Sequence, residues 1–244
     1  MSTSAPFISI FEDDIVFAEG WMTRTLLALA NLEFRNPGKE LAQHSWLYLR
    51  LFYTETSATM WKDTDFWYAN RWFTIFFAIL LGFFLLLQIR RYWAPSLPHL
   101  DNGTVAVLSF VTIPAFVILI FMVGKFNLFP PAHGPFLMNE NGCCTQAMVF
   151  PRQEVPGLIN YLHESHDGQS DSLIEDYCDR NSKDRFALVP YVVQHVGLVS
   201  SRDNTFVNAQ STWAFWFENF DSGELRTWHT DNVQKIPWVQ LKGG

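Results

Sequence analysis

Residues 7–14 read Phe7-Ile8-Ser9-Ile10-Phe11-Glu12-Asp13-Asp14, an apolar run that ends in three consecutive carboxylates. The apolar run predicts a strand, so negative charge is concentrated at the point where that strand ends. Such a concentration is stable when a cation neutralises it, commonly one that is bound together with a phosphorylated ligand. The structural alternative for the same acids is a turn or the cap of a helix.

The composition favours a folded protein with a sizeable core and argues against nucleic acid as a partner. The chain has 244 residues, of which 49% are hydrophobic and 16% aromatic, enough for one large domain or two small ones. Its formal net charge is -7, and its largest Lys/Arg cluster is Arg90-Arg91. Because binding to a phosphate backbone needs a basic surface, we expect no nucleic-acid partner.

Two long uncharged runs, from Trp72 to Ile89 and from Thr104 to Gly124, interrupt the polar parts of the chain. At 1.5 Å per residue each is long enough to cross a bilayer core of about 30 Å. Buried core helices can be equally apolar, but two such runs joined by a short loop with Pro95 and Pro98 favour a transmembrane hairpin. The sequence therefore predicts a multi-pass membrane protein with spans at about residues 70–89 and 104–124.

Two spans return the chain to the side of the bilayer on which it started. Residues 1–69 and 125–244 must then share a compartment, with residues 70–124 as a hairpin inserted between them. Arg90-Arg91 favours a cytosolic loop and therefore lumenal soluble parts, although Arg71 and Lys125 make the count of positive charges nearly balanced.

Residue spacing also predicts the main elements of the polar parts. We expect strands at 46–52, 145–150 and 186–189, a helix at 21–32, and a helix that starts at Pro151. A short acidic helix follows, with Asp171 at or near its N-cap. His195, beside a glycine-containing segment, is by itself more often structural than a ligand.

Three cysteines, Cys143, Cys144 and Cys178, match no zinc pattern, because the adjacent pair lacks a spaced second pair. In an oxidising compartment Cys178 could pair with either of the other two. Three reduced, buried thiols are an equally acceptable arrangement.

An acidic triplet after a strand, a glycine turn at Asn141-Gly142-Cys143-Cys144, an aspartate that opens a helix and a late histidine follow one another along the chain. This order resembles the GT-A glycosyltransferases. The resemblance implies an α/β, Rossmann-like domain that uses Mn²⁺ (or Mg²⁺) and a UDP-sugar donor. It further implies these roles: Asp14 as direct metal ligand, His195 as the late metal-site histidine, Glu12 and Asp13 at the ribose or a metal-bound water, Gly142 in the donor-sugar loop, and Asp171 as catalytic base.

A GT-A domain split by a membrane hairpin resembles one group in particular, the Golgi enzymes that add an N-acetylgalactosamine side chain to the glycan of GPI anchors. The likeness rests on Ile10-Phe11-Glu12-Asp13-Asp14, Gly142-Cys143-Cys144-Thr145-Gln146 and Gln194-His195-Val196-Gly197. It implies a GPI-type glycolipid or GPI-anchored protein glycan as acceptor, a lipid bilayer as partner, and a Golgi or endoplasmic reticulum location. Members of this group begin with an anchor and further strands, so we expect the GT-A domain of this chain to be incomplete.

Two other functions compete with this interpretation. A truncated or inactive glycosyltransferase-like membrane protein would bind a partner or glycan without turnover. A two-span channel subunit is disfavoured because neither span carries an ionisable residue to mark a pathway. Within the enzyme hypothesis, Glu175 and Asp176 are rivals to Asp171 as the base, because all three lie within one and a half turns of the same helix.

Overall fold

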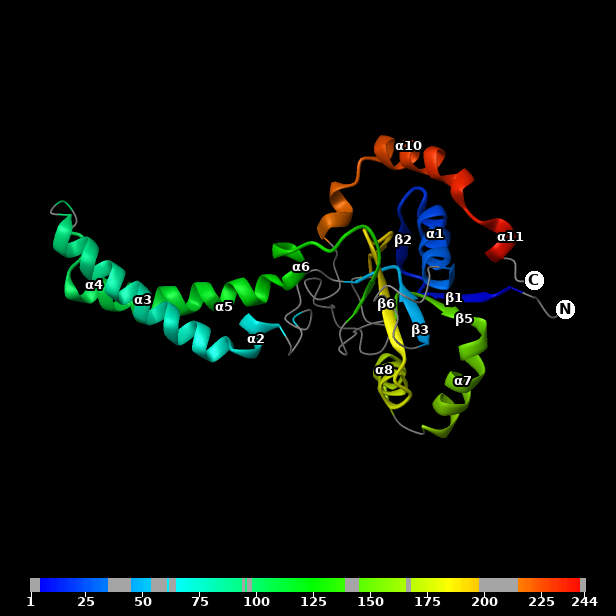
Figure 1. The fold of residues 1–244 in the computed structure, drawn as a ribbon, viewed down its shortest axis with the longest axis horizontal. Coiled ribbons are helices and arrows are strands. Elements are labelled where there is room, and N and C mark those ends of the chain that lie inside the picture. The colour runs from blue at the N-terminus through cyan, green and yellow to red at the C-terminus, as the bar shows by residue number, and fades with distance from the viewer. Residues whose placement is uncertain are drawn as a thin grey trace. The chain divides into compact units, whose positions relative to one another are not determined.

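The structure is a computed structural model that describes residues 5–34, 45–53, 61, 65–93, 95, 98–138, 145–165, 168–197 and 215–241 (Figure 1). The chain divides into two compact units. One unit comprises Met1–Glu55 together with Pro130–Gly244, and the other is the inserted segment Thr56–Phe129. Each unit is described by itself below.

A five-stranded mixed sheet forms the centre of the first unit. Its strand order is β1 (Phe7–Phe11), β5 (Ala147–Pro151), β3 (Trp46–Arg50), β6 (Asp184–Val189) and β4 (Gly134–Leu137). Both β1 and β3 run antiparallel to β5, and β3 runs parallel to β6, so β1, β3 and β6 point in the same direction. The two strands from before the inserted segment, β1 and β3, are each paired with strands from after it, and the two parts of the chain therefore make one domain.

Helices cover both faces of the sheet. Figure 1 shows α1 (Trp21–Phe34) and α10 (Ser222–Asn232) on one side, and α7 (Val155–Glu164) and α8 (Ser170–Arg180) on the other. All residues of β3 and β5 are buried between these layers. The smaller elements are a two-stranded sheet of β2 (Ile15–Phe17) and β7 (Val193–His195), α11 (Trp238–Leu241), and 3₁₀ turns at Arg152–Glu154, Phe215–Asn219 and Val233–Lys235.

The α/β class and the main elements agree with the sequence-based predictions, but the predicted helix start at Pro151 is wrong. Pro151 is the last residue of β5, where it pairs with Phe7 in an extended conformation. A 3₁₀ turn follows, and α7 begins at Val155 with Pro156 in its first turn. Pro156 therefore occupies the position that a helix tolerates for proline.

The inserted unit is a helical hairpin. Its arms are α3 (Arg71–Tyr92) and a continuous helix, Asn102–Val123, made of α4 (Asn102–Val107), a π-helical turn (Leu108–Thr112) and α5 (Ile113–Val123). Both arms are long and apolar enough to cross a membrane. A Cβ at Gly82 would lie 2.1 Å from Cδ1 of Ile113, so the glycine permits the arms to pack closely. The predicted pair of long apolar helices is confirmed.

Polar contacts join the hairpin at its open end, where α2 (Phe66–Ala69) and α6 (Lys125–Leu128) lie. Lys125 Nζ is 2.6 Å from Oδ1 of Asp65, and the indole N–H of Trp61 donates to the carbonyl of Phe121 at 3.1 Å. Indole rings and paired charges are typical of segments that border a bilayer.

Candidate metal centre

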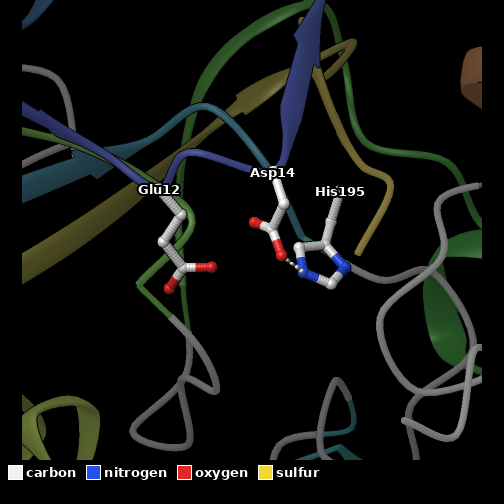
Figure 2. Close-up of side chains that lie close together, drawn as sticks. All are labelled: Glu12, Asp14 and His195. Atoms are coloured by element: carbon white, nitrogen blue, oxygen red, sulfur yellow. Dashed lines mark ion pairs between the residues drawn. The ribbon is translucent and has the colours of Figure 1, made fainter. Parts of the chain in front are cut away.

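Two carboxylates near the start of the chain meet a histidine that is distant from them in the sequence. The carboxylates of Glu12 and Asp14 and the imidazole of His195 each offer an atom within 4.8 Å of the others. Glu12 follows β1, Asp14 precedes β2, and His195 ends β7. In Figure 2 Asp14 and His195 point toward one another, and the Glu12 carboxylate extends from the same side of the backbone.

Strand pairing positions Asp14 beside His195. β2 runs antiparallel to β7, with Ile15 opposite His195, and the backbone N–H of Val196 donates to the Asp14 carbonyl at 2.9 Å. This pairing extends the ladder by one residue and brings Asp14 Oδ2 to 3.2 Å from His195 Nε2. The Asp14–His195 pair thus rests on backbone hydrogen bonds, which fix both residues.

Glu12 is held by the segment that leads into β5, not by the pairing of β2 with β7. Its backbone N–H donates to the carbonyl of Gln146 at 2.9 Å. Its Oε1 accepts a hydrogen bond of 2.8 Å from the hydroxyl of Thr145. Both contacts fix the Glu12 carboxylate next to the strand end.

The cluster lies at the edge of the sheet where the parallel strands end. Glu12 directly follows β1, and β3 and β6 end at the same edge because they run in the same direction as β1. In open α/β sheets ligands bind outside the carboxyl ends of the strands. The position of the cluster is therefore one that suits a bound ligand.

One oxygen of the cluster lacks a partner. Asp14 Oδ1 is buried and accepts no hydrogen bond from any described residue. The side chain of His195 is only 8% exposed and packs against the ring of Phe52, whereas that of Asp14 is 40% exposed. A buried oxygen without a donor is rare in folded proteins and is often found at functional sites. Two carboxylates and an imidazole fit a divalent cation such as Mn²⁺.

Gly197 leaves the space that the Asp14 carboxylate occupies. A Cβ at this position would lie 2.0 Å from Asp14 Oδ2 and 3.0 Å from His195 Nε2. The backbone of Gly197 does not have a positive φ, so the reason for glycine is steric. The side chains of Asp14 and His195 can approach one another only because residue 197 lacks a side chain.

The other predicted site residues lie elsewhere. Asp13 is exposed and outside the cluster. Gly142 lies outside the described residues, as do Cys143 and Cys144. Asp171 is in the first turn of α8, which confirms the predicted acidic helix, but the N-cap of that helix is Gln169. Asp171 is not part of the cluster.

The two rivals of Asp171 are engaged in other contacts. Glu175 is buried and accepts hydrogen bonds from Tyr48 at 2.6 Å and Arg50 at 2.7 Å, and it also pairs with Arg185. Asp176 accepts a hydrogen bond from Tyr161, which lowers its pKa, and forms an ion pair with Arg180 at 2.8 Å. These carboxylates are therefore poorly suited to accept a proton.

Asp171 has no such charged partner among the described residues. Its Oδ1 accepts the backbone N–H of Ser172 at 2.8 Å and lies 3.5 Å from the hydroxyl of the same residue. The carboxylate is partly exposed. Of the three acidic candidates on this helix, Asp171 alone forms no ion pair with a described residue.

Cys178 is a free thiol on the buried face of α8. Burial raises the pKa of this thiol to about 12, so the reactive thiolate is not populated near neutral pH. The free thiol agrees with the predicted arrangement in which Cys178 is reduced and buried. A buried, protonated thiol is not suited to a catalytic role.

Sequence reasoning missed Gly197 and Thr145 as supports of the cluster. Both belong to stretches that were compared with the GT-A family, but neither was assigned a role. Their roles depend on side-chain approach across the sheet edge, which residue spacing does not reveal. For Gly197, the available signal was the presence of a glycine two residues after a candidate metal ligand.

Comparison with known proteins identifies the family. Residues 1–194 match the family model for GPI-N-acetylgalactosamine transferase PGAP4. The match includes Glu12, Asp14 and Asp171 and ends one residue before His195. Searches of curated proteins and of solved structures found no match. Since the matched region covers most of the 244 residues, the chain belongs to the GPI-N-acetylgalactosamine transferase PGAP4 family, which is a family of glycosyltransferases.

Proposed function

We propose that this protein is a membrane-embedded, metal-dependent glycosyltransferase of the GT-A type. It transfers N-acetylgalactosamine, or a related hexose, from a UDP-sugar to the glycan of a GPI-type glycolipid or GPI-anchored protein. Family membership supports the transferase activity and the acceptor. The observation that carries the metal and donor assignments is the cluster of Glu12, Asp14 and His195 at the ligand-binding edge of the sheet.

Asp14, His195 and Glu12 hold the cation in this proposal, with Mn²⁺ preferred over Mg²⁺ because one ligand is an imidazole. The most direct support for that role is Asp14 Oδ1, which is buried and accepts no hydrogen bond from a described residue. When bound, the cation offsets the negative charge that develops on the departing UDP. Asp13 and Gly142 are assigned to the donor, at the ribose or metal-bound water and at the sugar respectively.

Replacing Gly197 with alanine is expected to impair the metal centre without unfolding the protein. The new methyl group would collide with Asp14 Oδ2 and displace the carboxylate. A displacement of about 1 Å at a catalytic site can cost about 10²-fold in rate. The measurement is the transfer rate at saturating UDP-sugar, with Mn²⁺ varied to determine its apparent affinity.

Val196→Ala is the matched control, because Val196 is the neighbouring residue and its side chain is 40% exposed. We expect this variant to keep the wild-type rate and Mn²⁺ affinity. Wild-type kinetics in Gly197→Ala would contradict the proposed role of the Asp14 carboxylate.

Asp171 is the proposed catalytic base. A short turn, Asn181 to Lys183, connects α8 to β6. Asp179 of α8 contacts Arg185 near the start of β6, and Glu175, one turn earlier in the helix, contacts Arg50 at the end of β3. These contacts support a position for Asp171 toward the edge that carries the metal cluster. A carboxylate that removes the proton of the acceptor hydroxyl would complete an inverting, in-line displacement of UDP.

The Asp171→Asn variant is expected to lower kcat by about 10²- to 10⁴-fold, the usual contribution of a general base. Binding of UDP in Mn²⁺ should remain unchanged, because the base contacts the acceptor rather than the donor. Asp176→Asn is the matched control on the same helix and should retain most of the rate. A large loss of kcat in Asp176→Asn alone would assign the base to that residue instead.

The exposed apolar surface of the hairpin supports embedding in a bilayer. Large side chains along both arms are exposed, among them Phe73, Phe77, Phe110 and Phe116. An apolar surface of this extent needs a lipid or protein cover. A hairpin that anchors the catalytic domain raises the local concentration of a lipid-anchored acceptor, as a short linker does. We place the catalytic domain in the Golgi or endoplasmic reticulum lumen.

The test is a transfer assay with detergent-purified protein, UDP-N-acetylgalactosamine and a GPI-type glycolipid, analysed by mass spectrometry. We expect a product heavier by one N-acetylhexosamine in Mn²⁺ and none after treatment with EDTA. UDP binding without any transfer would instead support the binding-only alternative. Equal transfer in EDTA would refute the metal-dependent mechanism.

A further inference from the structure

An arginine without an anionic partner faces a pocket of the first unit. The guanidinium of Arg24, on α1, lies over the ring of Trp228, on α10, at 3.8 Å from its centroid. Its Nε is buried and donates to no described residue. No carboxylate among the described residues pairs with Arg24, and burial lowers its pKa. A partly buried cation without a counter-ion is costly unless an anion is bound beside it.

The pocket around Arg24 has a volume of about 170 Å³. One face of α1 contributes Arg24, Ala28 and Asn31, which are spaced as neighbours on a helix. The start of β4 contributes His133 and Gly134, and the end of β6 contributes Leu188 and Val189, next to Gly134 in the sheet. Trp228 closes the remaining side.

The contact between α1 and α10 fixes the geometry of this pocket. Thr23 Oγ1 lies 2.8 Å from Nδ1 of His229, which is the neighbour of Trp228. A Cβ at Gly20 would lie 3.0 Å from Cβ of the same histidine, so the helices meet closely at the start of α1. The stacked Arg24 is therefore held in place before any ligand arrives, which reduces the entropic cost of binding.

The donors of the pocket indicate the class of ligand. Arg24, Asn31 and His133 can each donate a hydrogen bond, and no described residue of the pocket lining carries a carboxylate. Two donors from α1 and one from the segment before β4 can share the several oxygens of a phosphate group, which accepts charge-assisted hydrogen bonds. The volume exceeds that of a phosphate ion, and the apolar residues Leu27, Pro135 and Leu188 add surface for an organic group.

We propose that this pocket binds the phosphate group of an organic phosphate through Arg24, Asn31 and His133, independently of the metal cluster. Two sources share this chemistry in the proposed reaction, the phosphodiester of a GPI-type glycan and the diphosphate of a sugar nucleotide. The choice between these sources rests on the proposed function, whereas phosphate binding itself does not.

The test is calorimetric titration of the detergent-purified protein in EDTA, which removes the contribution of the metal cluster. The probes are myo-inositol 1-phosphate, phosphoethanolamine, UDP and inorganic phosphate. We expect at least one organic phosphate to bind about tenfold or more tightly than inorganic phosphate. Arg24→Gln should weaken that binding about tenfold or more, since charge-assisted hydrogen bonds are lost. The organic phosphate that shows this dependence identifies the source.

Arg226→Gln is the matched control, because Arg226 lies on α10, as Trp228 does, but is exposed and pairs with Glu19 at 2.9 Å. It should bind as the wild type does. Asn31→Ala tests the same pocket without removing a charge and covers the case in which Arg24→Gln does not fold. Binding that survives in Arg24→Gln or Asn31→Ala, or no preference over inorganic phosphate, would overturn the proposal. Because no transfer is measured, failure here is distinguishable from failure of the proposed function.

Discussion

Replacing Asp14 with alanine is expected to abolish sugar transfer and the Mn²⁺-dependent part of UDP binding. The variant removes both the oxygen that faces His195 and the buried oxygen that has no donor among the described residues. A catalytic cation contributes several kcal/mol to stabilising the transition state, so we expect a rate loss of about 10³-fold. UDP titration with and without Mn²⁺ separates loss of the cation from loss of the chemical step.

Stability should change little in Asp14→Ala, because the Asp14 side chain is 40% exposed and its removal frees a crowded site beside Gly197. Glu19→Gln is the matched control, since Glu19 is an exposed acid shortly after β2 whose neutralisation alters the charge by the same amount. It should retain both activities. Mn²⁺-dependent binding of UDP to Asp14→Ala with wild-type affinity would place the cation elsewhere.

Periodicity and hydropathy predicted most elements of the fold because those elements are decided locally. The apolar runs of the hairpin and the strand at Phe7–Phe11 each carry their own signal, and both appear where expected. The start of α7 was misplaced because two prolines, Pro151 and Pro156, both fit the first turn of a helix. Only the pairing of Pro151 with Phe7 in the sheet decides between them.

The sequence could nominate site residues but could not show which of them meet. Glu12 and Asp14 are adjacent to a strand end, yet the approach of His195 depends on β2 pairing with β7 across about 180 residues of sequence. Loop closure over such a distance is a property of the whole fold. The same limit applies to Arg24 and Trp228, whose stacking requires α10 to dock on α1.

Glu175 illustrates how burial separates a structural acid from a catalytic one. By position alone it rivals Asp171 on the same helix. Its carboxylate instead joins α8 to the sheet, with contacts to Tyr48 and Arg50 of β3 and Arg185 of β6. Arg185 also pairs with Asp179 of α8, so this helix supplies carboxylates to two buried arginines.

Replacing Glu175 with glutamine is therefore expected to destabilise the domain strongly, although the side chains have nearly the same shape. Breaking a buried ion pair typically costs about 3–5 kcal/mol, and Glu175→Gln removes the negative charge that Arg50 and Arg185 share. That is a large part of a total free energy of unfolding of about 5–15 kcal/mol. For a domain of this size we expect the midpoint of thermal unfolding to fall by about 10 °C.

The matched control for this stability measurement is Asp176→Asn, the neighbouring residue, whose ion pair with Arg180 is exposed. An exposed pair contributes at most about 1 kcal/mol, so its midpoint should fall by no more than a few degrees. Circular dichroism of both variants in the same detergent, followed with temperature, gives the comparison. Unfolding of Glu175→Gln at the wild-type temperature, together with loss of transfer activity, would show that Glu175 acts on the substrate. Asp171 would then not be the catalytic base.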